Sequence, residues 1–209
     1  THYHNDHLGG NAYYREHKIK IIGDSKIKEA YEKIPERFSS YQKVVSPETW
    51  DKSAVTLPDE YLDANLTLKA KRGNLTIFKP VKKAHTNADL VVYYPAAKTV
   101  VAADIAYSQM IVPIRDGSVK GSLEALKEIN KLSFTHIIGG HGKTMGRESY
   151  EFALAYMTAL RTKVKAAMDK GVELDGITKV VDMSEFKNAA LWDENPKNII
   201  VAYQEAEME

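Results

Sequence analysis

Four side chains that can bind a metal ion occur within the first seven residues, at His2, His4, Asp6 and His7. Histidine nitrogens and carboxylate oxygens hold zinc in catalytic sites, which leave one coordination position open for water. In an extended segment alternate side chains share a face, so His2 and His4 can reach one ion. Two glycines follow and allow a tight turn, so that Asp6 and His7 can face a second ion. The segment predicts a metal-dependent hydrolase.

Three later segments each place a further possible metal ligand next to an apolar run. His85 precedes the apolar run Leu-Val-Val-Tyr-Tyr, and Asp104 ends the run Val-Val-Ala-Ala. His141 follows Ile-Ile-Gly-Gly, an apolar strand that breaks into glycines and presents a histidine.

The pattern His-x-His-x-Asp-His followed by Leu-Gly-Gly, with the three later donors in this order, resembles the metallo-β-lactamase superfamily. Ala103 stands where the family usually has glycine before the aspartate. The resemblance implies an α/β fold, the αββα sandwich, and Asp6 and Asp104 as catalytic residues. It also implies two zinc ions per chain with these ligands: His2, His4 and His85 on one ion, Asp6, His7 and His141 on the other, and Asp104 between them.

Two cations within roughly 4 Å can share a hydroxide, which would be the nucleophile. The chain has no cysteine, which excludes a thiol nucleophile. The resemblance implies hydrolysis of an ester, thioester, lactone or lactam carbonyl in a small-molecule substrate. A bridging Asp104 is more similar to the thioesterases, lactonases and glyoxalase II-like members than to the lactamases. His4 argues against the flavodiiron branch, which usually has glutamate there.

Two other functions stay open. One is a mononuclear iron sulfur dioxygenase, because those members of the superfamily share much of the histidine pattern. The other is a non-catalytic metal-binding or ligand-binding module. Imidazole-rich sites suit zinc but also accept iron or manganese.

Composition narrows the class of protein. At 209 residues and 44% hydrophobic content, the chain can bury a sizeable core and is most simply one domain, residues 1–209. No apolar run approaches the ~20 residues of a membrane span. Lys plus Arg number 29 and Asp plus Glu 28, so the basic excess that nucleic-acid binding favours is lacking.

Apolar periodicity predicts alternating helices and strands. Helices are expected at residues 8–17, 26–38, 122–132, 147–170, 183–190 and 197–207, and strands at 18–22, 65–71, 74–79, 90–94, 99–103 and 135–138. Residues 45–63 are a candidate flap over the site. Of the remaining candidates, Tyr107 and Lys143 could contact substrate, whereas His17 and His136 lie outside the metal pattern.

Both ends of the chain differ from the family pattern. Members place several strands before the first metal motif, so we expect the N-terminal strands to belong to a missing segment or to a partner chain that completes the fold. A helical C-terminal extension from about residue 147 is similar to hydrolases of periplasmic quinoprotein relay and sulfur-oxidation systems. This similarity favours a periplasmic over a cytoplasmic location.

Overall fold

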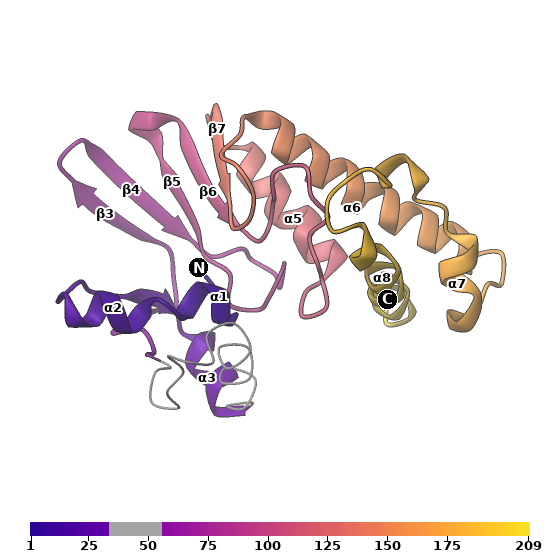
Figure 1. The fold of residues 1–209 in the computed structure, drawn as a ribbon, viewed down its shortest axis with the longest axis horizontal. Helices are drawn as coiled ribbons and strands as arrows, with labels where there is room; N and C mark the ends of the chain where they lie inside the picture. Colours follow the sequence, from indigo (N-terminus) through magenta and orange to yellow (C-terminus); the bar gives the residue numbers. More distant parts are fainter. Residues whose placement is uncertain (34–55) are drawn as a thin grey trace.

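The computed structural model describes residues 1–33 and 56–209 and is built around a five-stranded sheet (Figure 1). The strand order is β3-β4-β5-β6-β7. Neighbours are antiparallel except β6 and β7, which run parallel. The strands are β3 (Leu66–Ala70), β4 (Gly73–Phe78), β5 (Val91–Tyr94), β6 (Thr99–Ala103) and β7 (His136–Gly139).

The strand predictions for this sheet are confirmed. β3 and β4 form a hairpin in which Ala70 pairs with Gly73, as the alternating pattern around Arg72 indicated. β5 and β6 form a second hairpin, joined by the 3-10 turn η2 (Pro95–Ala97). β5 precedes this turn and β6 follows it, and the bounds of both strands lie within one residue of the expected ones. Their β-branched residues favour the extended conformation.

The two faces of the sheet bury different side chains. One row crosses all five strands through paired apolar residues: Leu66, Ile77, Val92, Val101 and Ile138. The opposite face carries Tyr93, Val100 and Ile137, also paired across strands. Val100 and Ile137 are fully buried, and they belong to the main core with the helices that follow.

Two long helices cover this second face (Figure 1). They are α5 (Val119–Asn130) and α6 (Arg147–Met168). The Ser118 side chain caps α5 by accepting a hydrogen bond from the Gly121 amide at 2.9 Å, so this helix begins three residues before the predicted start. Leu126, Met157 and Leu160 are almost completely buried, and burying each such side chain contributes about 1.5–3 kcal/mol.

The first face packs on a small sheet of two parallel strands, β1 (Ile22–Asp24) and β2 (Glu60–Leu62). Leu62 and Ile22 contact the row that contains Ile77 and Val92, so an apolar layer joins the two sheets. Outside the small sheet lies α3 (Lys26–Lys33), with Ile27 packed near Tyr61. The layer order is therefore helix, sheet, sheet, helix, and the predicted αββα fold class is confirmed.

Several predictions near the start of the chain need correction. The helix expected at residues 8–17 is two helices, α1 (Asn5–Leu8) and α2 (Asn11–Glu16), separated by a turn at Gly9 and Gly10, because glycine is a poor helix former. The strand expected at 18–22 begins only at Ile22, since Lys18 turns the chain with a φ of 56°. The predicted 26–38 helix is seen from Lys26 to Lys33, and its remainder lies outside the described residues.

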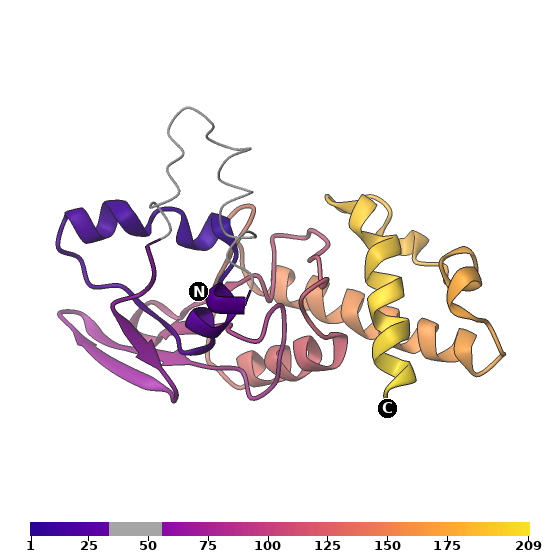
Figure 2. The ribbon, with the colours of Figure 1, turned by 90° about the horizontal axis from the view of Figure 1, so that it is seen from below.

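The C-terminal helical unit, residues 147–207, lies beside the sheet, and α8 crosses α6 (Figure 2). The long helix ends at Met168, and Gly171 follows with a φ of 79°. The predicted helix at 183–190 is wrong: only the 3-10 turn η3 (Ser184–Phe186) forms there. The unit also contains α7 (Leu174–Val180), η4 (Trp192–Glu194) and α8 (Asn195–Glu207).

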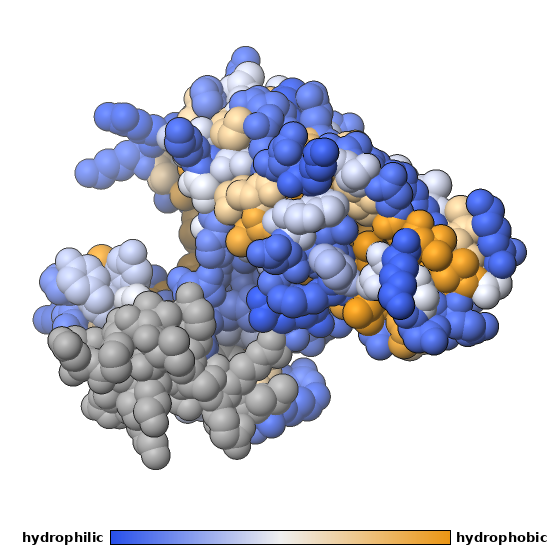
Figure 3. Space-filling view, turned by 45° about the vertical axis from the view of Figure 1, so that its right-hand side comes forward, coloured by the Kyte–Doolittle hydropathy of each residue, from blue (hydrophilic) through white to orange (hydrophobic). Residues whose placement is uncertain are grey.

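No helix in the described part of the chain combines the length and apolarity that a membrane span requires. Most of the visible surface is hydrophilic, and apolar patches reach it over the C-terminal helices (Figure 3). Exposed apolar residues of those helices and their connections are Leu174, Val180, Leu191 and Ile200.

Candidate metal centre

The predicted donors converge because their segments end at one edge of the main sheet. The opening segment is extended through His4 (φ −67°, ψ 149°), and α1 then carries Asp6 and His7. The backbone amide of Leu90 donates to the Thr1 carbonyl at 2.8 Å, which fixes the opening segment beside the start of β5. His85 precedes β5.

The last two donors follow β6 and β7. Because these strands are parallel, their carboxyl ends meet at the same edge, which places Asp104 and His141 near each other. Ala103 turns the chain with a φ of 48°, in the left-handed region where a non-glycine residue is strained. This conformation explains why glycine would suit the position.

The first group of donors is His2, His4, His85 and Asp104, each offering one atom within 4.8 Å of the others. His85 Nε2 lies 3.0 Å from His4 Nδ1 and 3.3 Å from Asp104 Oδ2. His2 Nε2 lies 3.8 Å from the same carboxylate oxygen. Three imidazoles and one carboxylate thus surround a single point.

The second group, Asp6, His7 and His141, shares the same separation limit of 4.8 Å. Asp6 Oδ2 lies 3.0 Å from His141 Nε2 and 3.4 Å from His7 Nε2. His7 Nε2 is also 3.2 Å from Asp104 Oδ1, while Asp104 Oδ2 faces the first group. Asp104 therefore lies between the two groups: Oδ1 faces His7, and Oδ2 faces the first group while also lying 3.6 Å from His141 Nε2.

His2 and His85 of the first group differ from His7 of the second in protonation state. Desolvation by burial lowers the pKa of His2 well below its usual value and that of His85 to about 4, so both are neutral at pH 7. Burial also lowers the pKa of His7, but hydrogen bonds to Asp104 and Asp6 outweigh it and raise the pKa to about 9.

The two carboxyl groups are ionised at neutral pH. For Asp104, burial raises the pKa, but His7 and His85 outweigh this effect and the pKa is lowered overall. For Asp6, burial acts in the same direction, and the hydrogen bond and charge of His7 hold the pKa well below its usual range. Both carboxylates can therefore act as anionic ligands.

A buried atom without a partner tests whether a cation fits. His2 Nε2 is buried, forms no hydrogen bond with any residue of the described ranges, and lies near the other donors of the first group. A buried ring nitrogen without a partner costs about 1–3 kcal/mol, and a cation at the shared point would remove that cost. Neutral imidazole nitrogens and carboxylate oxygens are also the donor set that zinc prefers. The residues fit a divalent cation.

Four supporting features are not evident from the local sequence. His4 Nε2 lies 2.9 Å from Asp116 Oδ2, so the other ring nitrogen faces the first group. Thr1 Oγ1 lies 2.9 Å from His7 Nδ1, which orients that ring similarly. A Cβ at Gly140 would lie 1.8 Å from Asp104 Oδ1, so only glycine allows this close approach.

The fourth feature is the contact of Tyr107 with Asp104, because the sequence indicated this tyrosine only as a possible substrate contact. Its hydroxyl donates to Asp104 Oδ2 at 2.5 Å. Burial, followed by the charge of Asp104, raises the pKa of Tyr107 far above its usual range, so the hydroxyl keeps its proton. Tyr107 is buried and orients Asp104.

A pocket of about 500 Å³ opens beside the centre. Five of the candidate ligands line it: His4, Asp6, His85, Asp104 and His141. Its other walls come from Tyr3, Asn5, the loop after Asp104, and the C-terminal helical unit. The pocket is large enough for a small-molecule substrate.

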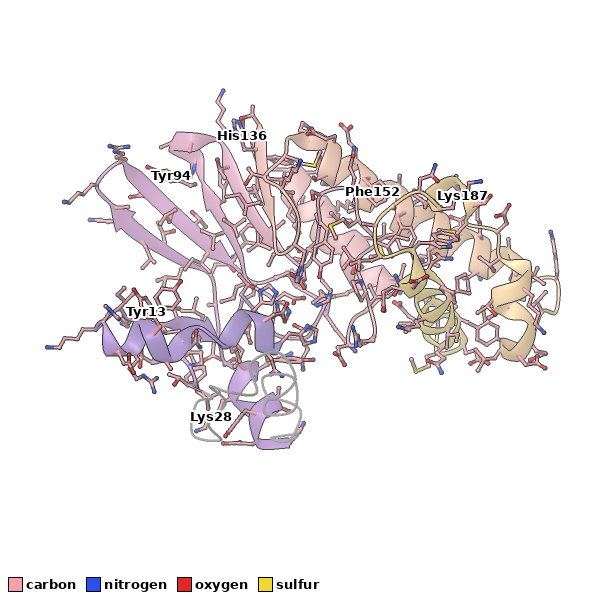
Figure 4. All side chains as sticks on the ribbon, in the orientation of Figure 1. Tyr13, Lys28, Tyr94, His136, Phe152 and Lys187 are labelled. Atoms are coloured by element: carbon pink, nitrogen blue, oxygen red, sulfur yellow. The ribbon has the colours of Figure 1, made fainter. Side chains whose placement is uncertain are left out.

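All seven predicted donors are thus brought together, and their role as metal ligands stays a prediction. His17 bonds the Tyr13 carbonyl through Nδ1, and the exposed His136 lies on β7 away from the opening segment (Figure 4); neither belongs to the two groups. The Lys143 side chain does not line the pocket. Of the candidate flap, residues 45–55 lie outside the described residues, and the rest forms β2 and its flanks, which pack on β1.

Comparison with known proteins agrees with the fold. The chain matches the family model of the metallo-beta-lactamase superfamily over residues 1–141. A metallo-beta-lactamase from Pontibacter korlensis is similar in structure, with a TM-score of 0.56 and 16% identity over 76% of this chain and 66% of that one. FIM-1 from Pseudomonas aeruginosa, in its mono-zinc form, has a TM-score of 0.57 and 20% identity over 76% and 64% of the two chains.

The chain thus covers about two thirds of the length of these lactamases, and at such identities the likeness concerns the fold. No functionally curated protein matches the sequence. The family match covers all seven converging donors and all five strands of the main sheet. This chain is a member of the metallo-beta-lactamase superfamily.

Proposed function

We propose that the chain is a metal-dependent hydrolase that uses two zinc ions to cleave an ester, thioester, lactone or lactam carbonyl. The observation that carries this proposal is the convergence of seven donors, from four separate segments, in two groups on either side of Asp104. The division into two groups favours this function over a mononuclear iron oxygenase, which needs only one.

Each ion would be held by its own set of residues. His2, His4 and His85 would hold the first ion, and Asp104 would contact both. The remaining donors, Asp6, His7 and His141, would hold the second. Bound divalent ions supply Lewis acidity that polarises a carbonyl and activates water as a nucleophile.

The side chains around the ions set the geometry. Tyr107 donates to Asp104 and fixes its orientation, while Asp116 fixes the ring of His4. Asp6 is 33% exposed and lines the pocket, so as a carboxylate it can accept a proton from water or pass one to a leaving group. The pocket is lined by members of both donor groups, so a substrate in it would lie beside both ions.

The test is hydrolysis by the zinc-loaded chain of a panel of thioesters, lactones and β-lactams. We expect turnover of at least one class, and Asp104→Ala should reduce it by more than about 100-fold, because several kcal/mol of transition-state stabilisation depend on the ions. Asp63→Ala, which removes an exposed carboxylate beyond β2, is the matched control. Turnover that survives Asp104→Ala, or no turnover of any class, would contradict the proposal.

A further inference from the structure

One helix of the C-terminal unit holds the loop that orients His4. The loop of residues 111–118 leads into α5 and carries Asp116, whose Oδ2 lies 2.9 Å from His4 Nε2. Side chains of α8 bond this loop both before and after Asp116. The family match ends at residue 141, so α8 lies outside it. The position of a candidate metal ligand thus depends on a helix that the family pattern does not include.

The first anchor is Asn198, on the buried side of α8. Its side chain accepts a hydrogen bond from the Ile114 amide at 3.0 Å and donates one to the Val112 carbonyl at 2.9 Å. It also donates to the Tyr156 hydroxyl of α6 at 3.1 Å, which fixes the amide group itself. Because Asn198 is 1% exposed, water does not compete for these bonds, and the loop is held firmly at Ile114.

The second anchor is Glu205, two helical turns after Asn198. Seven residues of an α-helix span about 10 Å and return to the same face, so both side chains can reach one loop. The Glu205 carboxylate accepts three hydrogen bonds, from the Ser118 hydroxyl at 2.8 Å and from the backbone amides of Val119 at 2.7 Å and Lys120 at 3.1 Å. These amides begin α5, where unpaired N–H groups and the helix dipole favour a negative charge.

Asp116 lies midway between the two anchors, two residues after Ile114 and two before Ser118. A tight turn closes the intervening chain, in which the Gly117 amide donates to the Ile114 carbonyl at 2.8 Å. With both flanks of the turn bonded to α8, the carboxylate of Asp116 is held where it meets the ring of His4. A carboxylate in this place orients a metal-binding histidine and strengthens metal binding.

We propose that Glu205 is a positioning residue of the candidate metal centre. By fixing Ser118 and the start of α5, it holds Asp116 against His4 and thereby strengthens zinc binding at the first group of donors. The inference rests on the proposed function in one respect, the presence of a zinc ion at that group. It gives α8 a role in metal affinity in addition to its packing against α6.

The test is zinc binding by the full chain, measured in competition with a chromophoric chelator at pH 7.5 and fitted to two sites. Glu205→Ala removes all three hydrogen bonds and should weaken the first site about tenfold, the lower end of the range for a histidine that loses its partner, because Glu205 acts through Asp116. The second site should keep its affinity. Glu205→Gln keeps an oxygen that accepts from the amides, so it should stay within about threefold of the wild type.

Two controls separate positioning from a general loosening of the helical unit. Glu209→Ala removes a nearby carboxylate that pairs with Lys120 and Arg161 rather than with the loop. Ile177→Val shortens a fully buried side chain of α7 and destabilises the same unit away from the loop. Both variants should bind zinc at the first site within about twofold of the wild type.

A double variant tests the route through Asp116. In a chain that already carries Asp116→Ala, the further change Glu205→Ala should cost less than about twofold in zinc affinity, because the contact that it supports is gone. Wild-type zinc affinity in Glu205→Ala would overturn the proposal. So would an equal loss in Ile177→Val, or a full tenfold loss when Glu205→Ala is added to Asp116→Ala, which would show that Glu205 acts by another route.

These outcomes are separable from the proposed function. A zinc site that depends on Glu205 in a chain that hydrolyses no substrate would contradict the hydrolase and leave the positioning role standing. Hydrolysis by a chain whose zinc affinity is insensitive to Glu205→Ala would contradict only the positioning role.

Discussion

Replacing Asp116 by alanine removes the acceptor that orients His4. His4 Nε2 lies 2.9 Å from Asp116 Oδ2, and the two side chains are only 19% and 17% exposed. A hydrogen bond to a charged group contributes about 1.5–3 kcal/mol, and partial exposure favours the lower part of that range. A loss of about 2 kcal/mol corresponds to about 30-fold in the zinc dissociation constant. This factor agrees with the effect expected when the partner of a metal-binding histidine is removed.

The assay is competition for zinc with a chromophoric chelator at pH 7.5, fitted to two sites. We expect the site that contains His4 to weaken about 30-fold in Asp116→Ala and the other site to keep its affinity. Asp116→Asn keeps an acceptor oxygen and should weaken the site less. Asp63→Ala provides the control. Zinc affinity of Asp116→Ala within about threefold of the wild type, or an equal loss in the control, would refute the reasoning.

Three further predictions concern the contact of Gly140 with Asp104, the buried hydrogen bonds of Asn198, and the pH dependence of metal binding. Gly140→Ala would place a Cβ 1.8 Å from Asp104 Oδ1, so we expect the carboxylate to be displaced and zinc affinity to fall by at least about tenfold in a chelator competition; unchanged affinity would contradict this. Asn198→Ala removes the side chain that bonds the buried Ile114 amide and Val112 carbonyl, and it should lower the free energy of unfolding by about 3 kcal/mol in urea titration. A loss below about 1 kcal/mol would show that these hydrogen bonds contribute little. His7, with its pKa raised to about 9, must lose a proton when a cation binds, so affinity at the second group should rise about tenfold per pH unit from pH 7 toward pH 9. The first group contains His85, neutral down to about pH 4, and its affinity should stay nearly constant over that range; calorimetry from pH 6 to 9 distinguishes the two, and parallel slopes would refute the assignment.

Local patterns predicted the parts of the fold that local physics determines. The strands from Leu66 to Ala103 alternate apolar and polar residues or carry β-branched runs, and each forms close to its expected bounds. The long helix from Arg147 has apolar residues at helical spacing and was also predicted correctly. Local spacing paired His2 with His4 and Asp6 with His7, whereas the assignment of His85, Asp104 and His141 to the two groups came from the resemblance to the superfamily.

Tertiary contacts determine the elements that local patterns did not predict. The short helix α7 contains Gly176, Ile177 and Thr178, all poor helix formers, and it is stabilised by the complete burial of Ile177. The helix expected through Ala190 fails because that residue is extended to pair with Met110. Propensity contains no information on either contact.

The partner of His4 could not be predicted for a similar reason. Asp116 lies 112 residues away in sequence, on a loop whose path is set by the C-terminal helices. A carboxylate in a loop has no distinguishing local pattern. The pocket wall at Leu191 likewise becomes apparent only when the fold brings residues 110 and 190 together.

The central claim is that seven side chains hold two metal ions on either side of Asp104. Its most direct test is the metal content of the purified, zinc-equilibrated chain by mass spectrometry, alongside Asp104→Ala. We expect about two zinc ions per wild-type chain and a clear loss in the variant. A single iron per wild-type chain, or zinc content that Asp104→Ala leaves unchanged, would contradict it.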